Sequence, residues 1–310
     1  MHTFSLLAAL AASATAIQQG FNYGATNNDG SCRKYDDFHR MYTRSQSLDQ
    51  PGFTSARLYT SIQCGSQNAP IEAIKAAIDT NTNLLLGVWA SAGQENVNQE
   101  IAALKQAVAN WGPDLKKRVV GISVGSEDLY RSSPQGVANN AGVGADAATI
   151  VKYIKQVRAG LKGTALAGVK IGHVDTWTAW ELPENAAVVT SVDWLGHNSF
   201  PYFETTKVNP IGQAKNLFFE GLSHTEGASK GKPVWITETG WPSKGPKSGQ
   251  AVASTLNQQK YWRQVGCGLF GNRNIWWYTL YDSNSAQTDL SFSVVNADEA
   301  AGSKFPLACP

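Results

Sequence analysis

Net charge is the first property that this sequence has little of. The 310 residues contain 26 Lys and Arg against 24 Asp and Glu, which gives a formal net charge of +2. Proteins that hold nucleic acid or an anionic membrane surface by charge carry a basic excess gathered on one face. The near balance of charge excludes such a footprint, so we expect no nucleic-acid partner and no membrane partner.

Long hydrophobic runs are also missing beyond the first few residues. No later stretch is apolar for long enough to cross a bilayer, and residues 304–310 form no hydrophobic tail for a lipid anchor. Residues 4–12, in contrast, are apolar, and Ala14-Thr15-Ala16 matches the small-x-small pattern of a signal cleavage site. We therefore predict a signal peptide over residues 1–16, with a first helix of the fold as the alternative. A single catalytic domain over 17–310 would then be a secreted, extracellular protein.

The motifs of metal sites and of serine hydrolases are absent. His39, His173, His197 and His224 form no pair at i, i+4, and no two cysteines lie close enough in sequence for a zinc site. No Gly-x-Ser-x-Gly elbow is present, which disfavours a Ser-His-Asp hydrolase. We expect no metal and no cofactor. His173 and His197 lie inside predicted strands, which is typical of hydrogen-bonded core histidines rather than of ligands.

Cysteines are few but even in number. The chain has Cys32, Cys64, Cys267 and Cys309, and an even count in a secreted chain favours two disulfides. Three pairings are compatible with the sequence. We favour the one that joins nearest neighbours, Cys32 with Cys64 and Cys267 with Cys309.

Aromatic residues, by contrast, are abundant. The chain has ten Trp, ten Tyr and eleven Phe, while charged residues make up only 16%. Such residues can fill a core, and they can also stack on sugar rings, because sugars present apolar C–H faces without charge. The composition is compatible with a carbohydrate-binding protein.

Strand-like runs alternate with helical patterns along the whole chain. Near-continuous apolar runs predict eight strands, at 21–24, 56–60, 84–90, 119–127, 169–177, 192–200, 234–240 and 275–282. Apolar residues recurring at three and four predict helices over 71–78, 100–108, 145–161, 211–222 and 250–265. Eight such units favour an α/β fold, a single (β/α)8 TIM barrel. An open doubly wound sheet is the competitor, but no Gly-rich phosphate loop follows any strand.

A barrel predicts where the functional residues lie. Active sites of this fold form at the C-terminal ends of the strands. Two glutamates, Glu127 and Glu238, stand at the ends of the fourth and seventh predicted strands. The other strand-end candidates for substrate binding are Tyr23, Arg57, Tyr59, Trp89, Asp175, Trp177, Asn198, Phe200, Tyr202, Trp241 and Tyr278.

Two carboxylates that face one another across a barrel mouth can hydrolyse a glycosidic bond. One stays ionised and attacks the anomeric carbon, while the other is kept protonated and gives its proton to the leaving oxygen. The retaining mechanism needs the carboxyl groups about 5–5.5 Å apart, and the inverting one about 6.5–9.5 Å. The simpler alternative for either glutamate is a structural ion pair, for instance with Arg57.

Three motifs carry a family resemblance. ITETGWPS at 236–243, SVGSEDLYR at 123–131 and FNYG at 21–24 together resemble glycoside hydrolase family 17 over essentially the whole mature chain. The likeness is to the fungal cell-wall branch of β-1,3-glucanases and β-1,3-glucanosyltransferases. It implies a retaining (β/α)8 enzyme on β-1,3-glucan, with Glu127 as acid/base and Glu238 as nucleophile. The wider clan has Asn before the acid where this chain has Ser126, which we expect to bind the sugar.

The remaining expectations rest on position. Tyr23 and Tyr59 could hydrogen-bond the nucleophile or the substrate, and Trp177 and Trp241 are candidates for sugar-stacking platforms. Because catalytic residues do not separate hydrolysis from transfer, we favour a glucanosyltransferase with residual hydrolysis, acting on the cell wall. A mainly hydrolytic endo-enzyme and a non-catalytic glucan-binding protein are the alternatives. We expect a monomer.

Overall fold

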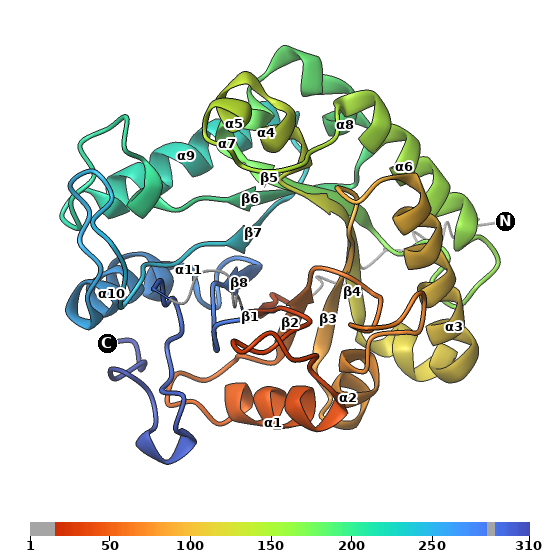
Figure 1. Ribbon diagram of the computed structural model, residues 1–310, viewed down its shortest axis with the longest axis horizontal. Helices are drawn as coiled ribbons and strands as arrows, with labels where there is room; N and C mark the ends of the chain where they lie inside the picture. The colour runs from red at the N-terminus through yellow and green to blue at the C-terminus, as the bar shows by residue number, and fades with distance from the viewer. Residues whose placement is uncertain (1–15, 284–288) are drawn as a thin grey trace, which may run out of the picture.

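The computed structural model describes residues 16–283 and 289–310, and its centre is a closed barrel of eight parallel strands paired in chain order (Figure 1). The strands are β1 Gln19–Tyr23, β2 Ser55–Leu58, β3 Asn83–Val88, β4 Val119–Ser126, β5 Ile171–Thr176, β6 Trp194–Asn198, β7 Val234–Glu238 and β8 Ile275–Trp277. Each lies within or next to one of the eight predicted runs. The predicted (β/α)8 barrel is confirmed.

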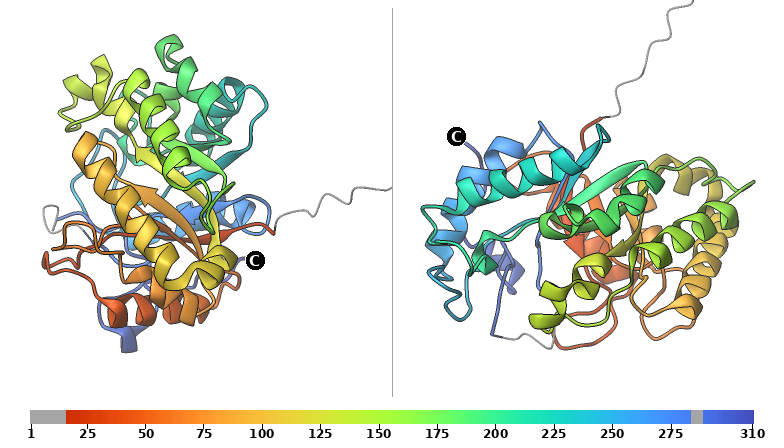
Figure 2. Two further views of the ribbon diagram at one scale, coloured as in Figure 1. Left: turned by 90° about the vertical axis from the view of Figure 1, so that its right-hand side faces the viewer. Right: turned by 90° about the horizontal axis from the view of Figure 1, so that it is seen from above.

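Helices surround the barrel on its outside (Figures 1 and 2). The longer helices are α1 Tyr35–Gln46, α2 Ala73–Asp79, α3 Gln94–Arg118, α6 Ala147–Gly160, α9 Ala214–Ala228 and α10 Thr255–Tyr261. The shorter ones are α4 Asp128–Ser132, α5 Pro134–Ala138, α7 Trp177–Trp180, α8 Ala186–Ser191 and α11 Cys267–Leu269, with single turns η1 Pro183–Asn185, η2 Pro201–Phe203, η3 Trp262–Gly266 and η5 Glu299–Ala301. The five predicted helices correspond to α2, α3, α6, α9 and α10 with η3. The short helices and α1 were not predicted.

Tryptophans fill the interior of the barrel. Trp194 and Trp235 stack with ring centroids 4.2 Å apart, and Trp276 lies 5.8 Å from Trp235. Gly172 makes room for this layer, since a Cβ there would come within 2.3 Å of the Trp194 ring. Trp277 points the other way and packs on Trp262 at 5.0 Å on the helix side. The large tryptophan rings, with Gly172 opposite them, fill the barrel interior below the C-terminal ends of the strands.

Strand register brings the strand-end residues together. Asn22 is aligned with Arg57 across β1 and β2, and Asn198 with Glu238 across β6 and β7. Asn22 is buried and donates to the carbonyls of Thr237 at 3.0 Å and of Trp276 at 2.8 Å. One amide thereby links β1 to β7 and β8, and it fixes the wall from which Glu238 projects.

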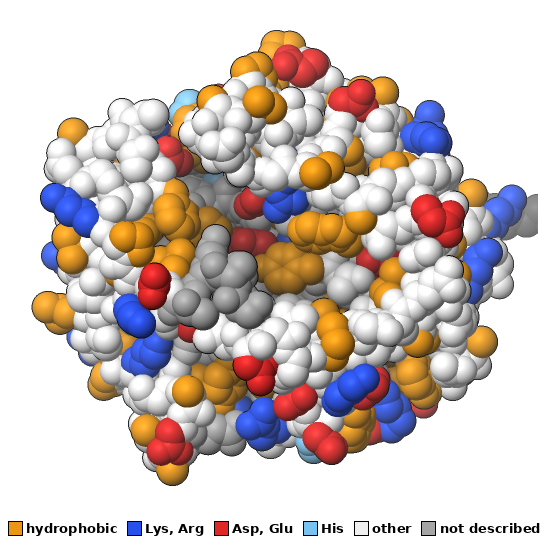
Figure 3. All heavy atoms as spheres, in the orientation of Figure 1, with side chains coloured by type: hydrophobic (Ala, Val, Ile, Leu, Met, Phe, Trp, Pro, Cys, Tyr) orange, Lys and Arg blue, Asp and Glu red, His pale blue; other side chains and the backbone are white. Residues whose placement is uncertain are grey.

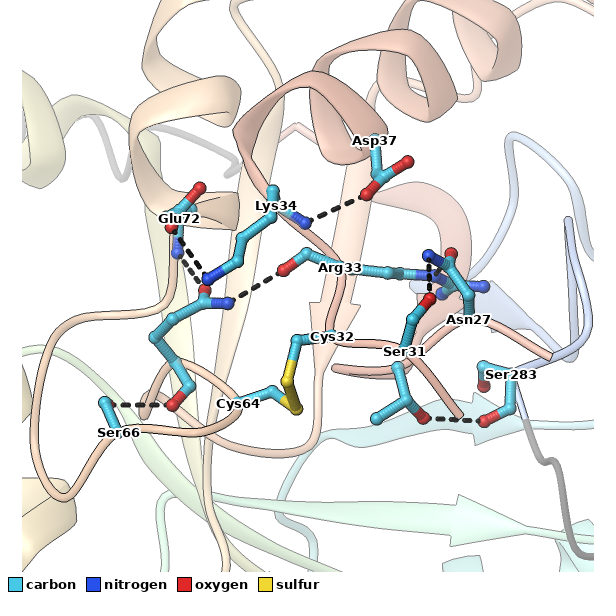
Figure 4. Close-up of a disulfide and its surroundings, with 12 residues drawn as sticks. Asn27, Ser31, Cys32, Arg33, Lys34, Asp37, Cys64, Ser66, Glu72 and Ser283 are labelled. Carbon is cyan, nitrogen blue, oxygen red and sulfur yellow. Dashed lines mark hydrogen bonds and ion pairs between the residues drawn. A yellow bond between two sulfur atoms is a disulfide. The ribbon is translucent and has the colours of Figure 1, made fainter. Parts of the chain in front are cut away.

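The two disulfides pair nearest neighbours, as predicted: Cys32 with Cys64 and Cys267 with Cys309. The first joins the loop after β1 to the loop after β2 (Figure 4), where the Gln63 side chain also donates to the Arg33 carbonyl at 2.8 Å. The second ties α11 to the C-terminal segment.

Two expectations concern the chain's targeting. No helix within the described ranges is both long enough and apolar enough to cross a membrane. The predicted signal peptide over 1–16 lies, except for its last residue, outside the residues that the structure describes.

Candidate active site

A cleft of about 640 Å³ lies over the C-terminal ends of the strands. Both Glu127 and Glu238 line it, and they reach it from β4 and β7 on different sides of the barrel. Figure 3 shows acidic and basic side chains inside this hollow, with hydrophobic side chains along its border. The strand-end prediction therefore identifies the place where two carboxylates share one mouth.

Glu238 is held by a buried arginine. The Arg57 Nη1 lies 2.6 Å from Glu238 Oε1, and the two side chains are only 1% and 10% exposed. Arg57 is itself fixed, because Nη1 donates to Asn22 Oδ1 at 2.7 Å and Nη2 to Ser126 Oγ at 3.0 Å. The ion pair considered as an alternative does form. It leaves Glu238 in the cleft wall, so it orients this carboxylate rather than removing it from the site.

Glu127 stands on a sharp turn between β4 and α4. Its backbone is left-handed, with φ at 60°, a conformation that is costly for a residue with a side chain and is concentrated at functional sites. Asn198 Nδ2 donates to Glu127 Oε1 at 3.0 Å, and Thr237 Oγ1 in turn donates to Asn198 Oδ1 at 2.8 Å. Arg131 Nη2 lies 3.6 Å from the other carboxyl oxygen. The Glu127 carboxyl is therefore fixed from two sides.

The two carboxyl groups have different surroundings. Burial, followed by the negative charge of Glu238, raises the pKa of Glu127 to about 7. Below that pH Glu127 is protonated, while Glu238 carries its own guanidinium partner. Two carboxyl groups in such different surroundings within one cleft are the arrangement that acid-base chemistry on a glycosidic bond requires.

Seven predicted binding residues also line the cleft. They are Tyr59, Trp89, Ser126, Trp177, Asn198, Phe200 and Tyr278. The Tyr59 hydroxyl is buried and faces Glu238, and burial, the Glu238 charge and a hydrogen bond to Glu238 raise its pKa. Trp177 is partly covered by protein, because its ring stacks on His224 at 5.0 Å and its Nε1 donates to Glu204 Oε1 at 2.9 Å.

Five residues that were predicted to bind substrate do not line the cleft: Tyr23, Arg57, Asp175, Tyr202 and Trp241. Arg57 is buried behind Glu238, and Tyr23 packs edge-on against Tyr42 below the mouth. Asp175 is fully buried and accepts hydrogen bonds from the backbone N–H groups of α4.

Tyr202 and Trp241 were expected at the mouth but belong to the core. Both are 0% exposed, and their rings meet edge-on at 5.3 Å. Trp241 Nε1 donates to the Val252 carbonyl at 3.0 Å, and Tyr202 donates to the Pro246 carbonyl. The loop after β7 folds back over the barrel, so the Trp241 ring offers no face to a sugar.

Some cleft residues were not predicted. Arg131 and Glu204 line the cleft beside Glu127 and Trp177, and Phe203 is half exposed there. Arg131 could have been found from SVGSEDLYR, since it follows Glu127 by one helical turn. Phe203 and Glu204 lie in a turn after β6 that carries no sequence pattern. In the described part of the chain, no group of three or more His, Cys, Asp or Glu side chains could hold a metal ion.

Comparison with known proteins decides the family. The family model described as the BtgE/BtgC glycoside hydrolase domain matches residues 20–294. The chain belongs to this glycoside hydrolase family. The matched residues contain both cleft glutamates, and the predictions of a family 17 glycoside hydrolase and of an enzyme are confirmed.

Relatives of this glycoside hydrolase agree with that assignment. A protein of Aspergillus fumigatus named probable glucan endo-1,3-beta-glucosidase is 51% identical over 309 residues, which are 99% of this chain and 69% of the relative. A glycoside hydrolase family 17 beta-1,3-glucanosyltransferase from Rhizomucor miehei has a similar structure, with a TM-score of 0.76 and 28% identity over 94% of this chain and 98% of that one. An active-site mutant of the Rhizomucor miehei enzyme in complex with laminaritriose gives 0.74 at 26% identity, with the same coverage of both chains.

Proposed function

We propose that this glycoside hydrolase cleaves β-1,3-glucan with retention and transfers the released piece to another glucan chain. The observation that carries the proposal is the pair Glu127 and Glu238, which share one cleft, Glu127 with a raised pKa and Glu238 against the Arg57 guanidinium. The choice of β-1,3-glucan is supported by the names of the Aspergillus and Rhizomucor relatives. Residual hydrolysis accompanies transfer, because water can also enter the cleft.

In the first step, Glu238 attacks the anomeric carbon and Glu127 gives its proton to the leaving oxygen. Arg57 favours the ionised carboxylate that attack requires. Asn198, bonded to Glu127 Oε1, holds the acid toward the cleft. A covalent glycosyl-enzyme forms as the leaving sugar departs.

In the second step, Glu127 changes role. Once Glu238 is esterified, it loses the negative charge that helps to raise the pKa of Glu127. The pKa of Glu127 then falls, so the group becomes a base that removes a proton from the incoming hydroxyl. An acceptor sugar releases a lengthened glucan, and water releases a shorter one.

Transfer requires that an acceptor sugar be held in place of water. Phe200, Phe203 and Tyr278 supply aromatic surface on one side of the cleft, and Trp177 lies on its wall. Positioning an acceptor against the reacting carbon raises its effective concentration by orders of magnitude. The Rhizomucor relative, itself a glucanosyltransferase, supports this choice. A mainly hydrolytic enzyme is the second candidate, favoured by the name of the Aspergillus relative at 51% identity.

A glucan-binding protein without turnover is disfavoured by the same residues. Binding alone needs neither a protonated Glu127 nor an arginine fixed on Glu238. We further propose that the protein acts as a secreted monomer on the fungal cell wall. The predicted signal peptide over 1–16 supports secretion, and the Aspergillus relatives support a fungal setting.

Product sizing after incubation with one purified laminari-oligosaccharide tests the proposed function. Products longer than the donor are expected, together with shorter ones. Shorter products alone would replace transfer by hydrolysis, and an unchanged donor would contradict both enzymatic readings. Glu238→Gln should abolish turnover while binding persists. Glu226→Gln, which alters a surface carboxylate paired with Arg273 at 2.8 Å, is the control and should behave like the unmodified enzyme.

A further inference from the structure

The turn that carries Glu127 has an unusual backbone conformation, which contacts with neighbouring residues must stabilise. Gly125 and Glu127 both have left-handed backbones, with φ at 86° and 60°. Such conformations persist in folded proteins where neighbouring groups over-determine them. The contacts around this turn therefore decide where the Glu127 carboxyl points.

Buried carboxylates hold the turn on both sides of Glu127. On the far side, Asp175 accepts from the backbone N–H of Leu129 at 2.9 Å and of Tyr130 at 3.2 Å. On the near side, Asp128 Oδ2 accepts from the backbone N–H of Ser126 at 2.8 Å. Both aspartates are 0% exposed, so two carboxyl groups lie together inside the protein. Buried charges of one sign need a positive partner.

His173 lies between these carboxylates and is itself 0% exposed. Its Nε2 is 2.9 Å from Asp175 Oδ2, and its Nδ1 is 2.6 Å from the carbonyl oxygen of Val124 on β4. A Cβ added at Gly125 would meet Asp128 Oδ2 at 2.3 Å and His173 Cε1 at 2.8 Å, so the ring edge and the second carboxylate border the same small space.

These contacts define the protonation of the ring. The Val124 carbonyl can only accept, so Nδ1 must carry a proton. Both oxygens of Asp175 already accept backbone N–H groups, Oδ2 from Leu129 and Oδ1 from Tyr130 and Thr176, so this carboxyl group acts as an acceptor toward the ring as well. Nε2 must then donate as well, and both donors are present only in the imidazolium.

The groups packed around the ring agree with a positive charge. Asp175 faces it from β5 and Asp128 from α4, while the ring contributed by α7, Trp180, is uncharged and lies edge-on at 5.6 Å. Burial by itself lowers the pKa of His173, but the two carboxylates and the Val124 carbonyl outweigh burial and raise it.

We propose that His173 is a positively charged positioning residue for Glu127. Through its contacts with Val124 and Asp175, His173 joins the end of β4 to the start of α4. Glu127 lies between these two elements, so its carboxyl is held where it meets the leaving oxygen. This inference rests on the proposed role of Glu127 as the acid. His173 touches neither substrate nor reacting atoms.

Nitrogen NMR of histidine-labelled protein tests the charge directly, without any variant. Both ring nitrogens of His173 should resonate as protonated at pH 6. His197 is the internal reference: among the described residues only its Nδ1 has a hydrogen-bond partner, Thr225, and burial lowers its pKa to about 3. A bare Nε2 on His173 would mean that Asp175 holds the proton, and would overturn the proposal.

The leaving group of the substrate tests the positioning role. His173→Gln should lower kcat/KM by about 100-fold on a laminarioside with a poor leaving group, because a displaced acid cannot protonate it. A dinitrophenyl laminarioside needs no acid, so its kcat/KM should change little. His197→Gln, at a histidine equally buried on β6, is the matched control and should alter neither value.

The outcomes separate this inference from the proposed function. An equal fall on both substrates for His173→Gln would indicate a general structural defect and overturn the positioning role. If Glu127→Gln leaves the leaving-group dependence unchanged, Glu127 is not the acid, and the positioning role fails with it. The NMR result would still decide the charge of His173.

Discussion

The protonation of Glu127 depends on a few neighbouring side chains. Burial and the Glu238 charge raise the pKa of Glu127 to about 7, while Arg131 and Asn198 act in the opposite direction. Because the acid must be protonated in the free enzyme, kcat/KM should fall as the pH rises through about 7.

On the alkaline limb of this pH profile, Arg131→Met should shift the fall in kcat/KM to higher pH. The substitution removes a positive charge near the Glu127 carboxyl, so the pKa of Glu127 rises further. A pH profile of kcat/KM on laminari-oligosaccharides measures the shift. Arg158→Met removes an arginine paired with Asp193 on the outer surface and should leave the limb in place. An alkaline limb that does not respond to Arg131→Met would contradict the assignment of the limb to Glu127.

Two tryptophans that look alike in sequence should behave differently. Trp241 is fully buried, so Trp241→Ala should lower the free energy of unfolding by about 3–5 kcal/mol. Trp177 lines the cleft, so Trp177→Ala should mainly raise KM for longer oligosaccharides. Denaturant unfolding and kinetics on both variants check this contrast. A Trp241→Ala enzyme that is as stable as the unmodified protein but has a raised KM would show that Trp241 binds substrate.

The site could be predicted where a side chain's direction follows from the strand that carries it. Glu127 and Glu238 are strand ends in a barrel, and that position alone places them at the mouth. Trp241 and Tyr202 lie in loops after the strands, and their direction depends on contacts with Val252 and Pro246, which local sequence does not encode. The role of Asp175 likewise depends on α4, a helix of five residues that no periodicity reveals.

At the scale of elements, helix α3 fixes the loops that bear Tyr59 and Trp89. Its buried Glu100 accepts from Thr60 Oγ1 at 2.5 Å, from the Ser61 N–H at 2.7 Å and from the Trp89 N–H at 3.1 Å. Burial raises the pKa of Glu100 to about 7 in spite of these hydrogen bonds.

A raised carboxyl pKa makes the fold less stable as pH rises. Between pH 4.5 and about 7 the folded protein binds a proton at Glu100 that the unfolded chain has released. Glu100 should therefore lower the free energy of unfolding by about 3 kcal/mol across this window, and Glu127, with its pKa also raised to about 7, should add a similar fall. Glu100→Gln should reduce this fall by about half, because Glu127 remains, as followed by urea unfolding at several pH values. An equally steep curve in the variant would exclude this contribution.

The strands could be predicted from the sequence more completely than the helices. All eight strands were predicted because buried parallel strands are near-continuous apolar runs. Helix α1 was missed because its buried face holds only Phe38, Met41, Tyr42 and Ser45 among polar residues, a weak helical period. The short helices after β4, β5 and β6 belong to the cleft loops, where function rather than packing sets the sequence.

For the molecule as a whole, the two disulfides cross-link segments near the start and the end of the barrel: Cys32 with Cys64, and Cys267 with Cys309. They span 32 and 42 residues, and each cross-link restricts the unfolded chain. Replacing either pair by serines should lower the free energy of unfolding by about 2–4 kcal/mol. Denaturant titration of the two double variants measures both effects, and a reductant should reproduce them in the unmodified protein. An unchanged midpoint would show that the cross-link adds no stability.

Glu238 should form a covalent glycosyl-enzyme during turnover. A 2-fluoro laminaribioside with a good leaving group should trap that intermediate, since fluorine slows both steps by destabilising the oxocarbenium-like transition state. Mass spectrometry of the digested protein should then find one fluorinated disaccharide on the peptide that contains Glu238, and none in Glu238→Gln. A label on another residue, or steady turnover of the donor with no label, would contradict the account.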